Sequence, residues 1–74
     1  MPDTETKQIQ IVVNGEPQTV PSPQTVQSVL VVLGVDGGRI AIELNRAIVR
    51  KSEWSSTPVP EGSTLEIVQF VGGG

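Results

Sequence analysis

The chain has 74 residues, which is room for one small domain, and 36% of them are hydrophobic while 18% are charged. A domain of this size buries only about 60% of the surface of its unfolded chain, so the core must be small. The sequence has neither cysteine nor histidine, which excludes thiol nucleophiles, Ser-His triads, disulfides and the common zinc ligand sets. Its net charge of −3 disfavours nucleic acid and anionic membranes as partners.

Residues 1–7 are polar and hold nothing that could anchor them to a core, so we expect a flexible N-terminus without a function. They lack the basic and apolar regions of a signal peptide. No stretch of the chain approaches the roughly 20 apolar residues of a membrane span. We therefore expect a cytoplasmic location.

Alternation of polar and aliphatic residues predicts a strand over residues 8–13. Asn14 and Gly15 form a strong signal for a tight hairpin turn, so a second, antiparallel strand over residues 16–20 should follow. Prolines come next, at positions 21 and 23, and we expect them to end the pairing because proline has no amide hydrogen to donate.

A short helix follows the first two strands. Thr25 suits the N-cap position, and aliphatic residues recur after it at the i, i+3, i+4, i+7 spacing of a buried stripe that ends at Leu33. Gly34 fits the left-handed position just past the helix end. The helix should therefore have about two turns.

The second half of the chain predicts three more strands. Residues 39–45 alternate, and residues 46–50 give a short apolar run after a tight turn at about Asn45-Arg46. Residues 51–60 are rich in turn formers, with Trp54 as a plug for one end of the small core. The last strand covers residues 64–71.

One helix with one apolar stripe and five strands with one apolar face each can close a core as a mixed sheet packed on the helix. This α+β arrangement is the ubiquitin-like β-grasp fold, and we assign it to residues 8–71. Helices usually connect parallel strands, so the first and last strands should lie side by side at the centre of the sheet.

The last strand leads into Gly72, Gly73 and Gly74. Three glycines cannot stabilise a fold, because glycine loses the most backbone entropy on ordering and has no side chain to bury. They fit a flexible arm of roughly 10 Å that carries a terminal carboxylate into a narrow site on another protein. The alternative is a frayed tail or an expression remnant.

The β-grasp order and the ending Phe70-Val71-Gly72-Gly73-Gly74 resemble the ThiS family of sulfur carrier proteins of thiamin biosynthesis. Internal stretches that follow the family's order and spacing are Asn14-Gly15-Glu16, Gln24-Thr25-Val26, Glu43-Leu44-Asn45, Ser52-Glu53-Trp54 and Glu61-Gly62. The resemblance covers about residues 8–74. It departs at Ser28, where the family often has a glutamate for a helix capping box, and in closing with three glycines where many members have two.

The resemblance implies a carrier rather than an enzyme, with no bound cofactor and no metal of its own. An E1-like adenylyltransferase would use ATP and magnesium to convert the carboxylate of Gly74 into an acyl-adenylate. A persulfide on a sulfur-transfer protein, a cysteine desulfurase or similar, would then displace AMP and leave a thiocarboxylate on Gly74. Thiazole synthase would receive the sulfur, and Gly72 and Gly73 would serve as the flexible arm.

Alternation also predicts a surface on which a partner could dock. Val68 and Phe70 fall on the side of the last strand away from the core, and Val12 falls on the same side of the neighbouring strand. With Val71, these residues would form an exposed apolar patch beside the arm, a feature that marks partner surfaces. We expect the adenylyltransferase to dock there unless loops cover these faces.

Three other functions share these sequence features. The sulfur carrier of molybdopterin synthesis has the same fold and a diglycine end, and so do ubiquitin-like protein modifiers. A plain β-grasp interaction module, whose tail has no function, belongs to a different class. Removal of Gly74 would abolish the function of a carrier and leave an interaction module unaffected.

Overall fold

The computed structural model describes residues 7–70, and the predictions for residues 1–6 and 71–74 lie outside the described residues. Within this part the elements follow in the predicted order, with one addition, a 3₁₀-helix. They are β1 (Gln8–Val13), β2 (Glu16–Pro21), α1 (Val26–Leu33), β3 (Ile40–Leu44), β4 (Ala47–Val49), the 3₁₀-helix η1 (Lys51–Ser56) and β5 (Thr64–Gln69).

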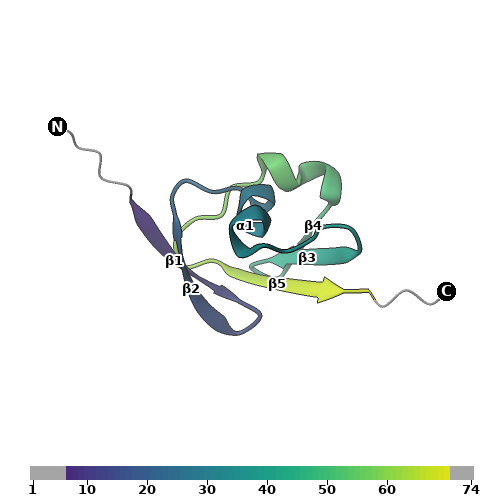
Figure 1. Ribbon diagram of the computed structural model, residues 1–74, viewed down its shortest axis with the longest axis horizontal. Coiled ribbons are helices and arrows are strands. Elements are labelled where there is room, and N and C mark those ends of the chain that lie inside the picture. Colours follow the sequence, from purple (N-terminus) through teal and green to yellow (C-terminus); the bar gives the residue numbers. More distant parts are fainter. Residues whose placement is uncertain (1–6, 71–74) are drawn as a thin grey trace.

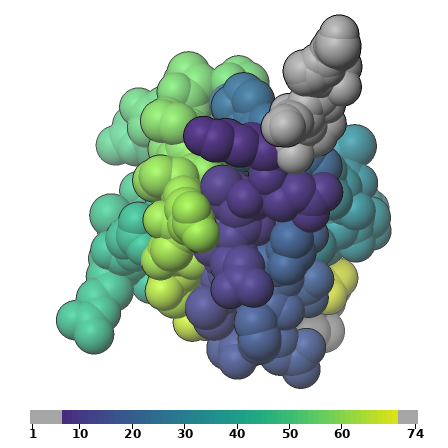
Figure 2. Space-filling view, turned by 90° about the vertical axis from the view of Figure 1, so that its left-hand side faces the viewer, coloured from purple at the N-terminus to yellow at the C-terminus, as the bar shows by residue number. Residues whose placement is uncertain are grey.

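The five strands form one mixed sheet in the order β2-β1-β5-β3-β4, and α1 covers one of its faces (Figure 1). β1 and β5 run parallel, whereas the other neighbours run antiparallel. Figure 2 shows β1 between β2 and the first part of β5. The predicted β-grasp fold is confirmed, including the central position of the first and last strands.

Two tight hairpins hold the outer strands. Asn14 and Gly15 both have positive φ angles, 50° and 83°, and so do Asn45 and Arg46, at 52° and 73°. Two consecutive left-handed residues are typical of the type I′ turn, whose twist matches that of paired strands. Both predicted turns are therefore present.

Some element ends differ from the prediction by a residue. We expected pairing to stop at Pro21, but Pro21 is the last residue of β2 and lies opposite Gln8. An edge strand tolerates proline because its outer N–H groups have no neighbouring strand to bond. The pairing even reaches one step further, since the N–H of Ser22 donates to the carbonyl of Lys7 at 2.9 Å.

α1 is capped at both ends by local hydrogen bonds. The Thr25 hydroxyl accepts from the N–H of Ser28 at 3.1 Å, and the Ser28 hydroxyl accepts from the N–H of Thr25 at 2.8 Å. Ser28 thus completes a capping box from the N3 position, where glutamate or glutamine is the usual residue. Gly34 ends the helix with a φ of 72°, as predicted. No helix among residues 7–70 is long and apolar enough to cross a membrane.

The core lies between α1 and the sheet, and Trp54 closes one end of it. Trp54 is 2% exposed, and its indole N–H donates to the carbonyl of Val49 at 3.0 Å, so the predicted plug is confirmed. η1 occupies the stretch for which we expected only turns, and it packs against α1. This helical turn brings the bulky indole under α1 and places the Lys51 ammonium 5.8 Å from the ring centre.

Candidate binding site at the end of the last strand

β5 lies between β1 and β3 and leads directly to the glycine tail. Its inner face is anchored, because Leu65 is fully buried and Ile67 packs against the core. The position from which residues 71–74 depart is therefore set by a central strand. This rigid base is what a short arm needs if its end is to reach a defined point.

Asn14 holds β5 from the β1 side. Its backbone N–H donates to the carbonyl of Leu65 at 2.9 Å. Its side-chain Oδ1 accepts from the N–H of Ile67 at 2.7 Å, and its Nδ2 donates to the carbonyl of Ile67 at 3.3 Å. The side-chain amide thus replaces the strand residue that β1 no longer supplies after its turn.

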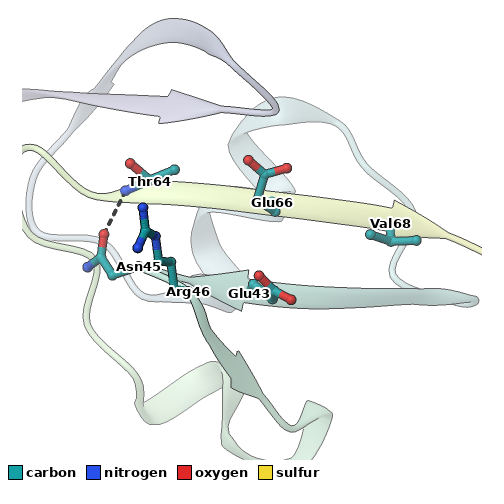
Figure 3. A pocket seen from close by; sticks show the side chains of 6 residues that line it. All are labelled: Glu43, Asn45, Arg46, Thr64, Glu66 and Val68. Carbon is teal, nitrogen blue, oxygen red and sulfur yellow. Dashed lines mark hydrogen bonds between the residues drawn. The ribbon is translucent and has the colours of Figure 1, made fainter.

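Asn45 does the same from the β3 side, at the start of β5. Its backbone N–H donates to the carbonyl of Thr64 at 2.8 Å, and its Oδ1 accepts from the N–H of Thr64, also at 2.8 Å (Figure 3). Sequence reasoning identified both asparagines as turn residues and missed this second role. Only the residue type could have indicated these side-chain hydrogen bonds. Glycine also tolerates positive φ, but it has no side-chain amide with which to form them.

The predicted docking residues are partly brought together. Val68 and Phe70 are 53% and 55% exposed, as predicted. Val12 is only half-buried and pairs with Thr64, four residues before Val68 and roughly 13 Å from it along the strand. The structure therefore places Val12 away from the other two residues. Val71 lies outside the described residues.

Two further apolar residues on the same face were missed. Ala41 lies directly opposite Val68 on β3, and Ile48 on β4 is 73% exposed. We refer to Ala41, Ile48, Val68 and Phe70 as the outer-face patch. Ile48 could have been found from the sequence, because its neighbour Val49 faces the core and adjacent strand residues face opposite sides.

Next to the outer-face patch lies a hollow of about 640 Å³ lined by Glu43, Asn45, Arg46, Thr64, Glu66 and Val68 (Figure 3). Glu43 and Glu66 lie directly opposite each other on adjacent strands, an arrangement in which like charges repel. In Figure 3 the Arg46 side chain extends toward Thr64 rather than toward the glutamates. The face therefore favours a partner that offers apolar contacts together with a cation.

The residues predicted to carry the chemistry, Gly72, Gly73 and Gly74, lie outside the described residues. What the structure describes is their base and its surroundings. These comprise an anchored strand, an exposed apolar patch on its outer face and a pair of carboxylates beside it. Such a surface is suited to binding another protein.

A family model for the ThiS family matches residues 5–74. The chain belongs to the ThiS family. This confirms the resemblance drawn from the Asn-Gly turn, the helix start and the glycine end, and it fits the β-grasp topology described above.

A solved structure of similar fold belongs to a ThiS family member. The crystal structure of a thiamine biosynthesis protein (ThiS) from Geobacter metallireducens superposes with a TM-score of 0.77 at 30% identity, covering 89% of this chain and all of that one. The solution structure of a thiamine biosynthesis protein from the same organism gives a TM-score of 0.73.

Curated relatives fall into two size classes. A thiazole synthase from Paramagnetospirillum magneticum is 42% identical over 66 residues, which are 89% of this chain and 20% of that protein. The chain thus spans about a fifth of the length of this thiazole synthase. The uncharacterized protein ycf40 of Porphyra purpurea is 37% identical over 68 residues and matches over 96% of its own length.

Proposed function

We propose that this protein is a sulfur carrier of thiamin biosynthesis whose Gly74 carboxylate is adenylated and then converted into a thiocarboxylate. The observation that supports this most directly is the match to the ThiS family through the final glycine, on a fold whose central strand leads to that glycine. The names of the structural relatives favour thiamin over molybdopterin synthesis.

The chemistry requires an activated carboxylate, because a free carboxylate is a poor electrophile. The Gly74 carboxylate attacks the α-phosphate of ATP, pyrophosphate leaves, and the acyl-adenylate results. The terminal sulfur of a persulfide then attacks the acyl carbon, and AMP leaves. A thiol reduces the resulting acyl disulfide and releases the Gly74 thiocarboxylate.

The carrier contributes access rather than acid or base catalysis. Glycine has no Cβ, so Gly72, Gly73 and Gly74 can pass through a channel too narrow for other residues. Three extended residues reach roughly 10 Å beyond the folded domain. The protein acts in this scheme as a co-substrate of other enzymes, not as an enzyme itself.

Three partners follow from the scheme. An E1-like adenylyltransferase supplies the ATP and magnesium site and docks on the outer-face patch at Val68 and Phe70. A cysteine desulfurase or similar protein supplies the persulfide, and thiazole synthase receives the sulfur. The thiazole synthase assignment is supported by relatives of that name that include a segment similar to this chain. Since activation consumes ATP, we place the reaction in the cytoplasm.

The experiment that tests the proposal is an intact-mass measurement after incubation with ATP, magnesium, a sulfur donor and the adenylyltransferase of the source organism. We expect a mass gain equal to the replacement of one oxygen by sulfur, with Gly74-deleted protein as the unreactive control. Absence of both adenylate and thiocarboxylate, with an enzyme shown to be active on another carrier, would favour an interaction module instead.

A further inference from the structure

The backbone of β5 points its hydrogen-bonding groups alternately to its two neighbours. The N–H of Phe70 donates to the carbonyl of Arg39 at 2.8 Å, on the β3 side. In an antiparallel pair, the N–H and C=O groups of successive residues point to opposite sides of the strand. The odd-numbered residues of β5 therefore direct their N–H and C=O groups toward β1, as the bonds between Asn14 and Ile67 confirm.

Gln69 is the first residue of β5 that finds no neighbour on the β1 side. The carbonyl of Leu65 is bonded by the Asn14 backbone, and both groups of Ile67 are bonded by the Asn14 side chain. β1 pairs with β5 only as far as Leu65. Within residues 7–70 no group bonds the N–H or C=O of Gln69, so the strand has a free edge there, in the middle of the sheet order.

A groove of about 620 Å³ lies along this free edge, on the face of the sheet that α1 covers. Its lining includes aliphatic side chains from β1, β3, β5 and the end of α1, among them Val13, Leu33, Ile40 and Ile67. Gln69 lines it as well. A strand that paired with Gln69 would point every second side chain toward this groove, because strand side chains alternate between faces.

The charges of the groove are of one sign. The two charged residues that line it are Glu16, at the tip of the first hairpin, and Asp36, in the loop after α1. Both are exposed, and the Asp36 carboxylate accepts from the N–H of Gly38 at 3.1 Å. A segment entering the groove would thus be favoured by a lysine or arginine beside its apolar side chain.

We propose that an extended segment of thiazole synthase pairs with the free edge of β5 at Gln69. The segment inserts an apolar side chain into the groove and places a cation near Glu16 and Asp36. Addition of a strand to an exposed edge is a common mode of peptide recognition, in which backbone hydrogen bonds give affinity and side-chain pockets give selectivity.

This inference rests on the proposed function. An enzyme that takes sulfur from Gly74 must lie within reach of Phe70, since residues 71–74 extend over roughly 13 Å at most. Gln69 is then inside the contact area. The adenylyltransferase faces the same distance limit, but the outer-face patch offers it a separate surface, and the relatives that contain a similar segment are thiazole synthases.

A proline at position 69 tests the contribution of the free edge to binding. Gln69→Pro removes the N–H that points to the β1 side and leaves the hydrogen bond from the Phe70 N–H to the carbonyl of Arg39 in place. Gln69→Ala changes the side chain and keeps the N–H, so it is the matched control. We expect Gln69→Pro to bind the thiazole synthase of the source organism about tenfold more weakly, the effect of one lost hydrogen bond, and Gln69→Ala to bind within about twofold of the unaltered chain.

Two further measurements make the test independent of how the proline variant folds. In the unaltered chain, the amide hydrogen of Gln69 should exchange about tenfold more slowly in the complex than in the free protein. A synthetic chain with an ester in place of the amide at Gln69 should show the same loss of affinity as the proline variant. Thiocarboxylation of Gln69→Pro and of Gln69→Ala, with the adenylyltransferase and the sulfur donor together, should proceed at the rate of the unaltered chain.

Several results would overturn the inference: unchanged affinity of the ester variant, unchanged exchange at Gln69, an equal loss in Gln69→Ala, or loss of thiocarboxylation rather than of thiazole synthase binding. The last result would assign the edge to the adenylyltransferase. A protected Gln69 in a chain that never becomes thiocarboxylated would support the edge contact and reject the sulfur carrier function, so the two failures are distinguishable.

Discussion

The side-chain amide of Asn14 forms two hydrogen bonds with the backbone of Ile67, 53 positions later in the chain. One residue therefore makes the first hairpin turn and also holds the strand that leads to the glycine tail. The contact extends the central pairing by two residues and leaves the next edge position, Gln69, free. A turn residue thus determines where the sheet offers an edge.

We expect Asn14→Ala to lower the free energy of unfolding by about 2 kcal/mol. Loss of two exposed side-chain hydrogen bonds accounts for about half of this effect, and the positive φ of 50°, which alanine adopts at a cost, accounts for the rest. Urea denaturation followed by circular dichroism measures the change.

Asn14→Gly separates the two causes, since glycine accepts positive φ but has no amide. Its free energy of unfolding should fall by about 1 kcal/mol. Hydrogen exchange at the Ile67 amide should become faster in Asn14→Gly and in Asn14→Ala. Equal stability of the glycine variant and the unaltered protein would show that the amide contributes nothing and that only the turn conformation matters.

The Thr25 and Ser28 capping box gives a second prediction. Thr25→Ala and Ser28→Ala should each lower the free energy of unfolding by about 1 kcal/mol. The first leaves the N–H of Ser28 without its side-chain partner, and the second leaves the N–H of Thr25 without its own. The double variant should cost less than the sum of the two, since either change already breaks the reciprocal pair. Thermal unfolding of the four proteins measures this coupling.

Gln27→Ala is the control for the capping box, because Gln27 is exposed in the same turn. Its stability should match that of the unaltered protein within about 0.5 kcal/mol. Strict additivity of the Thr25 and Ser28 changes would contradict a reciprocal box and leave two independent contacts.

Much of the fold followed from local patterns. Alternation fixed the strands, the spacing after Thr25 fixed the helix, and Asn14-Gly15 fixed the first turn, because each depends on neighbours in the sequence. A tight turn at Asn45-Arg46 was also expected from the break between two apolar runs, and the φ angles there identify it as type I′. The 3₁₀-helix around Trp54 was missed, because its cause is the fit of one indole under α1.

The candidate site was less predictable. Exposure of Val68 and Phe70 followed from alternation on a single strand. The separation of Val12 from Val68 depends on the register of β1 against β5, and that register is set by contacts between distant parts of the chain. The clamp of Asn14 on Ile67 depends on the same register, so no local pattern could show it.

A third prediction concerns the close approach of Gly37 to the core tryptophan. A Cβ at position 37 would lie 3.0 Å from Cζ3 of Trp54, and the indole is buried and hydrogen-bonded in place. Gly37→Ala should therefore lower the free energy of unfolding by about 1–3 kcal/mol. The fluorescence of Trp54, the one tryptophan of the chain, reports on both unfolding and repacking.

Gly38→Ala is the matched control, because its Cβ would make only ordinary contact, 3.5 Å from the Asp36 carboxylate. It should change stability by no more than about 0.5 kcal/mol. A Gly37→Ala protein as stable as Gly38→Ala would mean that the indole shifts freely, against its role as a fixed plug.

The last prediction tests the outer-face patch as the adenylyltransferase surface. Phe70→Ala should raise the carrier concentration needed for half-maximal ATP–pyrophosphate exchange by about tenfold, because aromatic side chains are frequent hot spots of binding. The maximal rate should stay unchanged, since the chemistry takes place at Gly74.

Val31→Ala is the control, because Val31 is 70% exposed on α1, which covers the opposite face of the sheet. Both variants should unfold like the unaltered protein. If Phe70→Ala and Val31→Ala were adenylated with the same concentration dependence, the activating enzyme would have to approach the tail from another side of β5.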